Sequence, residues 1–324
     1  MKQILTTFFK FAVAAGLIYW LSTSGKFDLK LTIEVLNPVS FIICCLLVLT
    51  NLLLTNLRWY VLLIGQEIKI KFWPVFKLGL IGIFFNFAMP GGVGGDIVKA
   101  FYLLKENPDK KTASAFTVLM DRIIGFASMA FLALAALISQ WDLLFSKWEL
   151  QSMALVLVGI LVGFVFLVLL SVSPRLVELF KIEQILSNLP KGEKFVKILE
   201  AFSSYGKRPM IYIQTLGLSM MAQSAVVGVV YAVAVFLGND QIDFAACYFA
   251  VPLAMMVAAA PIAPAGIGIG QAAIFSFFAY VGVDDPMAGS IGITIVQLML
   301  LLWGLVGAGF YLSYNQKSME SSNA

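Results

Sequence analysis

Long apolar stretches are the feature that most constrains the fold of this chain. Six of them reach about 18 residues or more, which is enough to cross the hydrocarbon core of a bilayer as a helix. They lie at roughly 5–22, 38–64, 112–139, 152–172, 210–237 and 287–313. In lipid every backbone amide must be hydrogen-bonded within the protein, and a helix achieves this locally. The sequence therefore predicts an all-α, polytopic membrane protein, with a single integral membrane domain over residues 1–324.

The composition supports this prediction and excludes several classes of function. Of the 324 residues, 60% are hydrophobic, 12% are charged and none is histidine, which excludes histidine-based acid–base catalysis and the usual zinc sites. Cys44, Cys45 and Cys247 have neither a CxxC spacing nor a histidine partner. The sequence also has no GxxxxGK[ST] phosphate loop. We therefore expect no metal, no cofactor and no nucleic-acid partner, and we assign no catalytic residue.

The first apolar stretch has two interpretations. Lys2 followed by apolar residues resembles a signal peptide. A retained membrane helix is favoured, because residues 22–26 (STSGK) lack an A-x-A cleavage pattern and the side chain of Lys10 can extend to the lipid headgroups.

The distribution of lysine and arginine predicts the orientation, because cytoplasmic loops carry the excess of these residues. The basic segments are the N-terminus, residues 65–77, 97–111 and 173–209, and the C-terminal tail. The segments between them, at 23–37, 140–151, 238–243 and 283–286, carry only Lys26, Lys30 and Lys147. Both termini are therefore expected on the cytoplasmic side of the cytoplasmic (inner) membrane.

Two further apolar stretches, 74–104 and 244–282, are interrupted by proline and glycine. The first joins two basic segments and the second joins two acidic or neutral ones, so each must return to the side from which it enters. The sequence predicts two re-entrant helical hairpins that enter from opposite faces. The residues expected at their tips are Pro90, Gly91, Gly92, Gly94 and Gly95 in the first hairpin, and Pro264, Gly266, Gly268 and Gly270 in the second.

The two hairpin tips share a P-x-G-x-G pattern, and each hairpin is flanked by two spans. Because the polarity is reversed between the two units, residues 38–139 and 210–313 are predicted to form an inverted-topology repeat, a design whose binding sites lie near the membrane midplane. The alternative is that two glycine-rich turns match by chance. Residues 173–209, between the units, are expected to form a cytoplasmic amphipathic loop.

Polar residues near the tips form the candidate substrate site: Arg58, Asp96, Lys99, Asp121, Arg122 and Gln271. A charge at membrane depth costs about 2.5–3.5 kcal/mol, so these side chains should pair or face water. The helix N-termini at the tips add partial positive charge, which favours an anion such as phosphate. Simpler interpretations are an N-cap of a helix 97–104 for Asp96 and headgroup-level anchors for Arg58 and Lys99. Asp121 and Arg122 could likewise form a structural ion pair between helices.

Four motifs resemble the membrane region of lysylphosphatidylglycerol synthases and the stand-alone proteins related to it. They are LRWYVLL at 57–63, NFAMPGGVGGDIVKAFYL at 86–103, DRIIGF at 121–126 and PAGIGIGQAAIF at 264–275. The resemblance implies a flippase-like membrane domain without the soluble synthase domain, and it places the candidate charged residues and both tips on the family's motif positions. The family commonly has a glutamate in the region of Gln271, so an aminoacylated lipid is not the expected substrate.

These observations favour a transporter over an enzyme. The expected function is the movement of an anionic phospholipid, or of a polyprenyl-phosphate-linked lipid, across the membrane through a midplane site that binds its phosphate. One alternative is a membrane-embedded transferase acting on lipid-linked substrates, and another is a membrane assembly partner without transport activity. The sequence leaves open a homo-oligomer and a separate lipid-modifying enzyme as partners.

Overall fold

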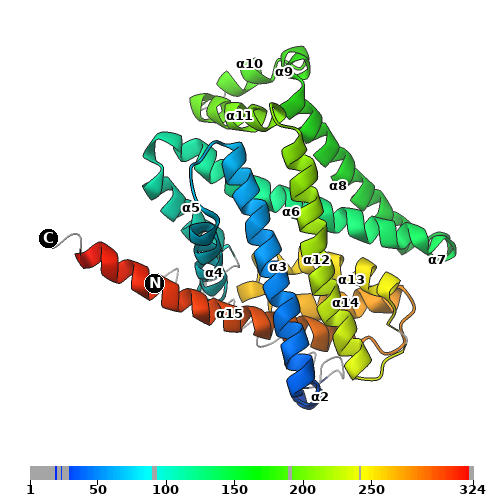
Figure 1. Cartoon of the computed structure of the whole chain (residues 1–324). Helices are drawn as coiled ribbons and strands as arrows, with labels where there is room; N and C mark the ends of the chain where they lie inside the picture. The colour runs from blue at the N-terminus through cyan, green and yellow to red at the C-terminus, as the bar shows by residue number, and fades with distance from the viewer. Residues whose placement is uncertain are drawn as a thin grey trace.

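The computed structural model describes residues 19, 23, 29–89, 93–188, 192–240 and 242–320. All regular secondary structure in these residues is helical (Figure 1), which confirms the all-α prediction. Five helices are long and apolar enough to cross a membrane, and they match five of the six predicted spans: α3 (Pro38–Gly65), α6 (Lys111–Ser139), α8 (Trp148–Val172), α12 (Met210–Phe236) and α15 (Met287–Glu320). The predicted span at 5–22 lies outside the described residues except for Tyr19. The chain is a polytopic membrane protein.

Helices α3 and α12 pack side by side over much of their length (Figure 1). The start of α3 is fixed by Asn37, whose Oδ1 accepts hydrogen bonds from the amides of Val39 and Ser40, both at 3.0 Å. Farther along, Asn51 Nδ2 donates to the carbonyl of Ala222 on α12 at 2.9 Å. Polar contacts between helices are needed here because apolar side chains gain little by leaving a lipid environment.

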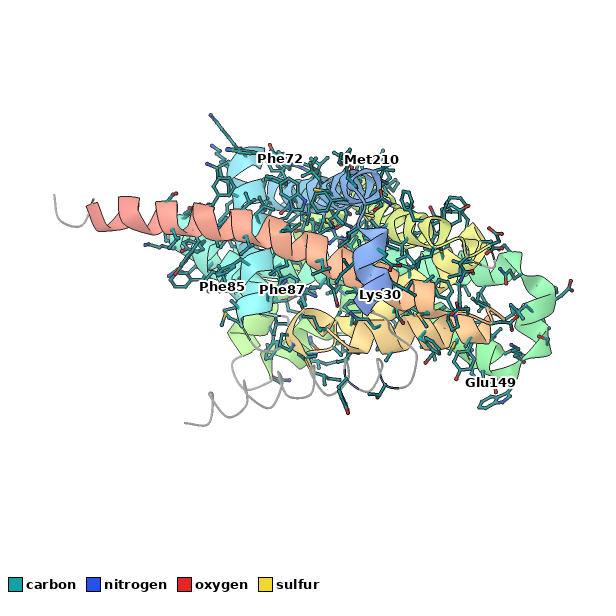
Figure 2. The ribbon with its side chains drawn as sticks, turned by 90° about the horizontal axis from the view of Figure 1, so that it is seen from below. Lys30, Phe72, Phe85, Phe87, Glu149 and Met210 are labelled. Carbon is teal, nitrogen blue, oxygen red and sulfur yellow. The ribbon has the colours of Figure 1, made fainter. Side chains whose placement is uncertain are left out.

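Helices α6 and α15 contact both α3 and α12, whereas α8 packs against α6. Helix α15 runs obliquely across the bundle and contacts α4, α12 and α14 (Figures 1 and 2). Helix α8 is the least buried of the five spans, since only 17% of its most apolar window is buried within the protein. Its many exposed leucine, valine and phenylalanine side chains are therefore suited to face lipid.

Each interrupted stretch forms a helical hairpin, in which two shorter helices pack against each other. The first pair is α4 (Phe72–Ala88) and α5 (Gly94–Glu106). The second pair is α13 (Phe244–Ala258) and α14 (Ile269–Tyr280), joined through the 3-10 helix η2 (Pro264–Gly266). Their lengths of 17, 13, 15 and 12 residues fall short of the roughly 20 residues that a span needs. Both interrupted stretches are therefore broken into two helical arms, as predicted.

Glycine allows the close approach of backbone in both hairpins. In the first, a Cβ at Gly95 would overlap the carbonyl oxygen of Gly82, so the two arms touch there without side chains between them. Gly94 and Gly95 lie in the first turn of α5, and Gly270 lies in α14. Pro90, Gly91 and Gly92 of the first tip lie outside the described residues.

The second tip is a tight turn inside the protein. Ala265, Gly266 and Gly268 have φ values of 48°, 69° and 82°, in the left-handed region that glycine adopts most easily. The η2 turn lies against α4, so the second hairpin reaches the first one within the bundle.

The predicted amphipathic loop at 173–209 contains three helices: α9 (Pro174–Leu179), α10 (Ile182–Ser187) and α11 (Gly192–Gly206). Tyr205 at the end of α11 is fully buried, and its hydroxyl donates to the carbonyl of Leu62 at 3.0 Å. This segment is therefore anchored to α3. The remaining described elements are α2 (Leu29–Val35), η1 (Pro108–Lys110) and α7 (Trp141–Ser146).

Candidate functional site

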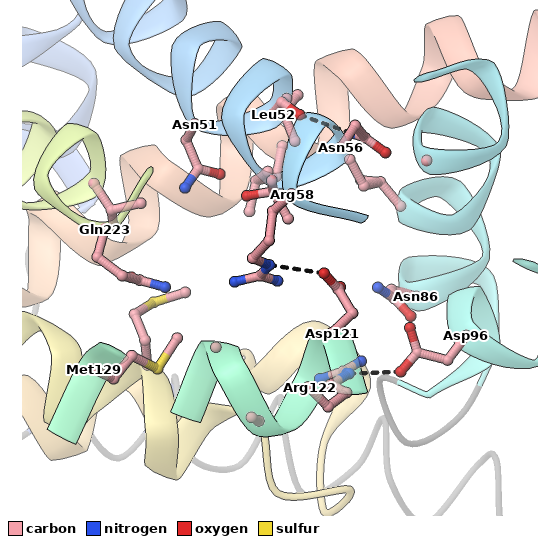
Figure 3. A pocket seen from close by; sticks show the side chains of 18 of the residues that line it. Asn51, Leu52, Asn56, Arg58, Asn86, Asp96, Asp121, Arg122, Met129 and Gln223 are labelled. Carbon is pink, nitrogen blue, oxygen red and sulfur yellow. Dashed lines mark hydrogen bonds and ion pairs between the residues drawn. The ribbon is translucent and has the colours of Figure 1, made fainter. Parts of the chain in front are cut away.

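A cavity of about 230 Å³ lies inside the bundle between α3, the first hairpin, α6 and α12, with α13 and α15 also lining it (Figure 3). It brings together five of the six predicted site residues, which come from three helices: Arg58 from α3, Asp96 and Lys99 from α5, and Asp121 and Arg122 from α6. Because a water molecule occupies roughly 30 Å³ in the liquid, the cavity can hold several waters or a small polar group.

Arg58 and Asp121 form the more buried of two ion pairs in this cavity. Arg58 Nε lies 2.7 Å from Asp121 Oδ1, and the two side chains are 7% and 13% exposed. Arg58 Nη1 also donates to Ser219 Oγ on α12 at 2.6 Å, and that hydroxyl shares a 2.6 Å hydrogen bond with Ser128 on α6. Three helices thus hold this guanidinium in place. Arg58 is therefore buried within the protein and paired there, and its side chain does not extend to the surface as a headgroup-level anchor would.

Arg122 and Asp96 form the second ion pair, which is less buried. Arg122 Nε lies 2.5 Å from Asp96 Oδ2, and the side chains are 35% and 22% exposed. Asp121 and Arg122 therefore do not pair with each other. Adjacent residues on a helix point in different directions. Asp121 therefore forms its ion pair with a residue of α3, and Arg122 forms its ion pair with a residue of α5. Helix α6 is thereby tied both to α3 and to the first hairpin.

Asp96 does not cap α5, so that interpretation of the sequence was wrong. The helix begins at Gly94, which places Asp96 at its third position. An amide side chain satisfies one of the first backbone N–H groups instead, because Asn86 Oδ1 on α4 accepts from Gly95 N at 2.8 Å. The carboxylate of Asp96 nevertheless lies in the first helical turn, where negative charge is favourable.

Lys99 has a different partner from the two arginines. Its Nζ lies 5.0 Å from the centroid of the Trp59 ring, a cation–π geometry. Among the described residues no carboxylate lies within 4.0 Å of it. The cavity thus has three cationic and two anionic side chains, so its lining carries one net positive charge. A ligand group with one negative charge would balance it.

Gln271 is not among the residues that line this cavity. Its Oε1 accepts from Gly268 N at 2.8 Å, and its Nε2 donates to Gln297 Oε1 at 2.7 Å and to Thr294 at 3.1 Å. Gln297 Nε2 in turn donates to the Ala265 carbonyl at 3.2 Å. The amide of Gln271 therefore holds the second tip in shape. The second hairpin contributes only Met255 and the adjoining Ala259 to the cavity, so the N-termini of the two second arms do not meet around one site.

Comparison with known proteins relates the chain to membrane proteins. The family model described as the lysylphosphatidylglycerol synthase TM region matches residues 7–309, which include the whole cavity. The chain belongs to the lysylphosphatidylglycerol synthase TM-region family. It is also 25% identical to a UPF0104 membrane protein from Pyrococcus horikoshii, in an alignment of 346 positions that covers 100% of both chains.

In this family member, the charged residues of the cavity are accompanied by neutral polar ones that the sequence analysis did not identify. They are Asn51, Thr55 and Asn56 on α3, Asn86 on α4 and Gln223 on α12. A signal for two of them, Asn51 and Thr55, was present, since residues 51, 55 and 58 are spaced four and three apart and so share one face of α3 with Arg58. Asn56 is 3% exposed, and its Oδ1 has no hydrogen-bond partner among the described residues.

Proposed function

We propose that this protein transports a lipid across the cytoplasmic membrane, and that the lipid is an anionic phospholipid or a polyprenyl-phosphate-linked lipid. The observation that carries the proposal is a polar cavity with one net positive charge inside a bundle of apolar helices. Charged side chains at membrane depth are costly and typically mark a substrate or ion pathway. The charge balance fits a phosphodiester, which carries one negative charge.

The three cationic side chains of the cavity suit different roles. Lys99 is held by an aromatic ring and can turn towards an anion without breaking an ion pair. The Arg122–Asp96 pair is partly exposed, so the guanidinium of Arg122 can also donate to a phosphate oxygen. The Arg58–Asp121 pair is buried and fixed by Ser219, so it maintains the shape and charge of the cavity. The acyl or polyprenyl chains would stay in the surrounding lipid.

The proposal includes two re-entrant hairpins of opposite polarity, arranged as an inverted repeat, with both termini in the cytoplasm. The short arms of α4–α5 and α13–α14 support it, as does the difference in basic residues between the segments that flank them.

The topology can be tested by cysteine labelling in a variant without the three native cysteines. We expect Asp109→Cys to react with a membrane-impermeant maleimide only from the cytoplasmic side, and Asp284→Cys only from the outer side. Lys147→Cys, in the predicted outer loop after α6, serves as the reference for the outer side. Labelling of Asp284→Cys from the cytoplasm would contradict the second hairpin.

Transport itself can be tested with purified protein in proteoliposomes that contain a lipid labelled on its acyl chain. We expect the labelled anionic lipid to reach the opposite leaflet faster than in protein-free liposomes, with the lipid chemically unchanged. Conversion of a lipid-linked sugar without transport would favour the membrane-embedded transferase. The absence of both activities for every lipid class would favour the assembly partner.

A further inference from the structure

Two residues that do not line the cavity hold the side chain of Lys99. Its Nζ lies 5.0 Å from the centroid of the Trp59 ring on α3. Its alkyl chain lies against Gly82 on α4, where an added Cβ would be 3.0 Å from Lys99 Cε. Lys99 lines the cavity, whereas Trp59 and Gly82 do not. The most direct route by which these two residues can influence a ligand in the cavity is therefore through Lys99.

The ring of Trp59 is held in turn by α6. Trp59 is 1% exposed, and its Nε1 donates to Thr117 Oγ1 at 3.2 Å. The hydroxyl of Thr117, which is also buried, donates to the carbonyl of Ser114 at 2.8 Å. A threonine hydroxyl can accept and donate at the same time, so the two hydrogen bonds can form together. They set the orientation of the ring beside Lys99.

An aromatic ring holds a cation differently from a carboxylate. Arg58 and Arg122 each pair with an aspartate, whose negative charge offsets that of the guanidinium. A tryptophan ring attracts an ammonium group through its quadrupole, most strongly where water is excluded, but it carries no net charge. The ring of Trp59 can therefore hold Lys99 in place and leave its positive charge to be balanced by a ligand.

We propose that Trp59 is a positioning residue, which holds the ammonium group of Lys99 at the cavity for an anionic ligand. Thr117 orients the Trp59 ring, and Gly82 leaves room for the alkyl chain of Lys99. This inference rests on the proposed transport function and explains how the site keeps an uncompensated positive charge inside the membrane domain.

The first test measures the transport of labelled phosphatidylglycerol in proteoliposomes with equal amounts of folded protein. Trp59→Leu should slow transport by about threefold to thirtyfold, the range expected from the loss of a buried cation–π interaction. Trp59→Phe keeps an aromatic face and should retain most of the wild-type rate. A wild-type rate in Trp59→Leu would overturn the proposal.

A double variant distinguishes positioning from packing. In the Lys99→Gln background, Trp59→Leu should cause no further loss of transport, because a residue that acts through Lys99 has no effect once that lysine is removed. Losses from the two substitutions that multiply in the double variant would show that Trp59 acts independently of Lys99, and would overturn the proposal.

Gly82→Ala tests the same geometry in a variant that should fold even if Trp59→Leu does not. The added methyl group would press on Lys99 Cε, whereas the nearest backbone atom, the carbonyl oxygen of Gly95, is 3.4 Å away. Because alanine favours a helix more than glycine does, stability should not fall, yet transport should slow by about threefold. The matched control is Gly217→Ala on α12, which has no heavy atom within 4 Å of the added Cβ and should transport at the wild-type rate. Equal rates for both variants would contradict the role of Gly82.

A spectroscopic measurement separates this inference from the transport proposal. Reductive methylation with a ¹³C label keeps the charge of lysine and gives each lysine an NMR signal in the detergent-purified protein. The Lys99 signal, identified by its absence in Lys99→Gln, should lie upfield because of the Trp59 ring current, and it should move downfield in Trp59→Leu. Lys77→Gln identifies the signal of Lys77, which also lies over aromatic rings.

The two measurements can fail separately. An upfield Lys99 signal that depends on Trp59, without transport of any lipid, would overturn transport and support the positioning role. Transport that requires Lys99, together with a Lys99 signal that Trp59→Leu does not move, would support transport and overturn the positioning role.

Discussion

Replacing Arg58 with methionine is expected to lower the free energy of unfolding by about 3–5 kcal/mol. The substitution leaves the carboxylate of Asp121, which is 13% exposed, without its partner at 2.7 Å. It also removes the donor to Ser219. An unpaired charge in such surroundings costs far more than the loss of an exposed ion pair. Denaturant-induced or thermal unfolding of the purified protein in detergent micelles measures the effect.

Two further variants make this result specific to the buried pair. The double variant Arg58→Met, Asp121→Leu should recover most of the loss, because it leaves no charge unpaired. Arg208→Met removes an arginine 3.4 Å from Glu67 on the exposed surface, and it should cost less than about 1 kcal/mol. If Arg58→Met were as mild as Arg208→Met, the buried pair would not stabilise the cavity as described.

Replacing Lys99 with glutamine is expected to reduce lipid transport by about tenfold to a hundredfold, the range for losing a hydrogen bond to a charged group. Among the described residues, Lys99 is the cationic side chain of the cavity that has no carboxylate within 4.0 Å. Its removal brings the net charge of the lining to zero. Stability should change little, because the substitution leaves no opposite charge unpaired.

The spans and hairpin arms could be predicted from sequence because their causes are local. The span predicted at 38–64 is helix α3 at 38–65, and the span predicted at 210–237 is α12 at 210–236. Bilayer thickness sets the length of an apolar helix, and proline and glycine mark its interruption. The breaks within both hairpins could be predicted from the proline and glycine residues there.

The charged residues of the site were also predictable, but their pairing was not. Charges stand out in apolar stretches because they are costly there. Asp121 and Arg122 are neighbours in sequence, yet one pairs with Arg58 on α3 and the other with Asp96 on α5. That choice depends on how three helices pack.

Packing also determines the positions of the residues that could not be placed from the sequence. Gln223 reaches the cavity because α12 packs against α3, and a glutamine within an apolar helix gives no such signal by itself. Gln271 stands near the second tip in sequence, but the left-handed turn at Gly268 directs its amide into the tip itself.

The central claim is that an anionic lipid passes through the cavity, and the transport rate of Lys99→Gln tests it most directly. The matched control is Lys77→Gln. Lys77 also lies over aromatic rings, with its Nζ 5.6 Å and 5.3 Å from the centroids of Trp73 and Phe310, and it is absent from the cavity lining. In proteoliposomes with equal amounts of folded protein, we predict that Lys77→Gln transports labelled phosphatidylglycerol at the wild-type rate and that Lys99→Gln is at least about tenfold slower. Equal rates for the wild type and both variants would contradict transport through this cavity.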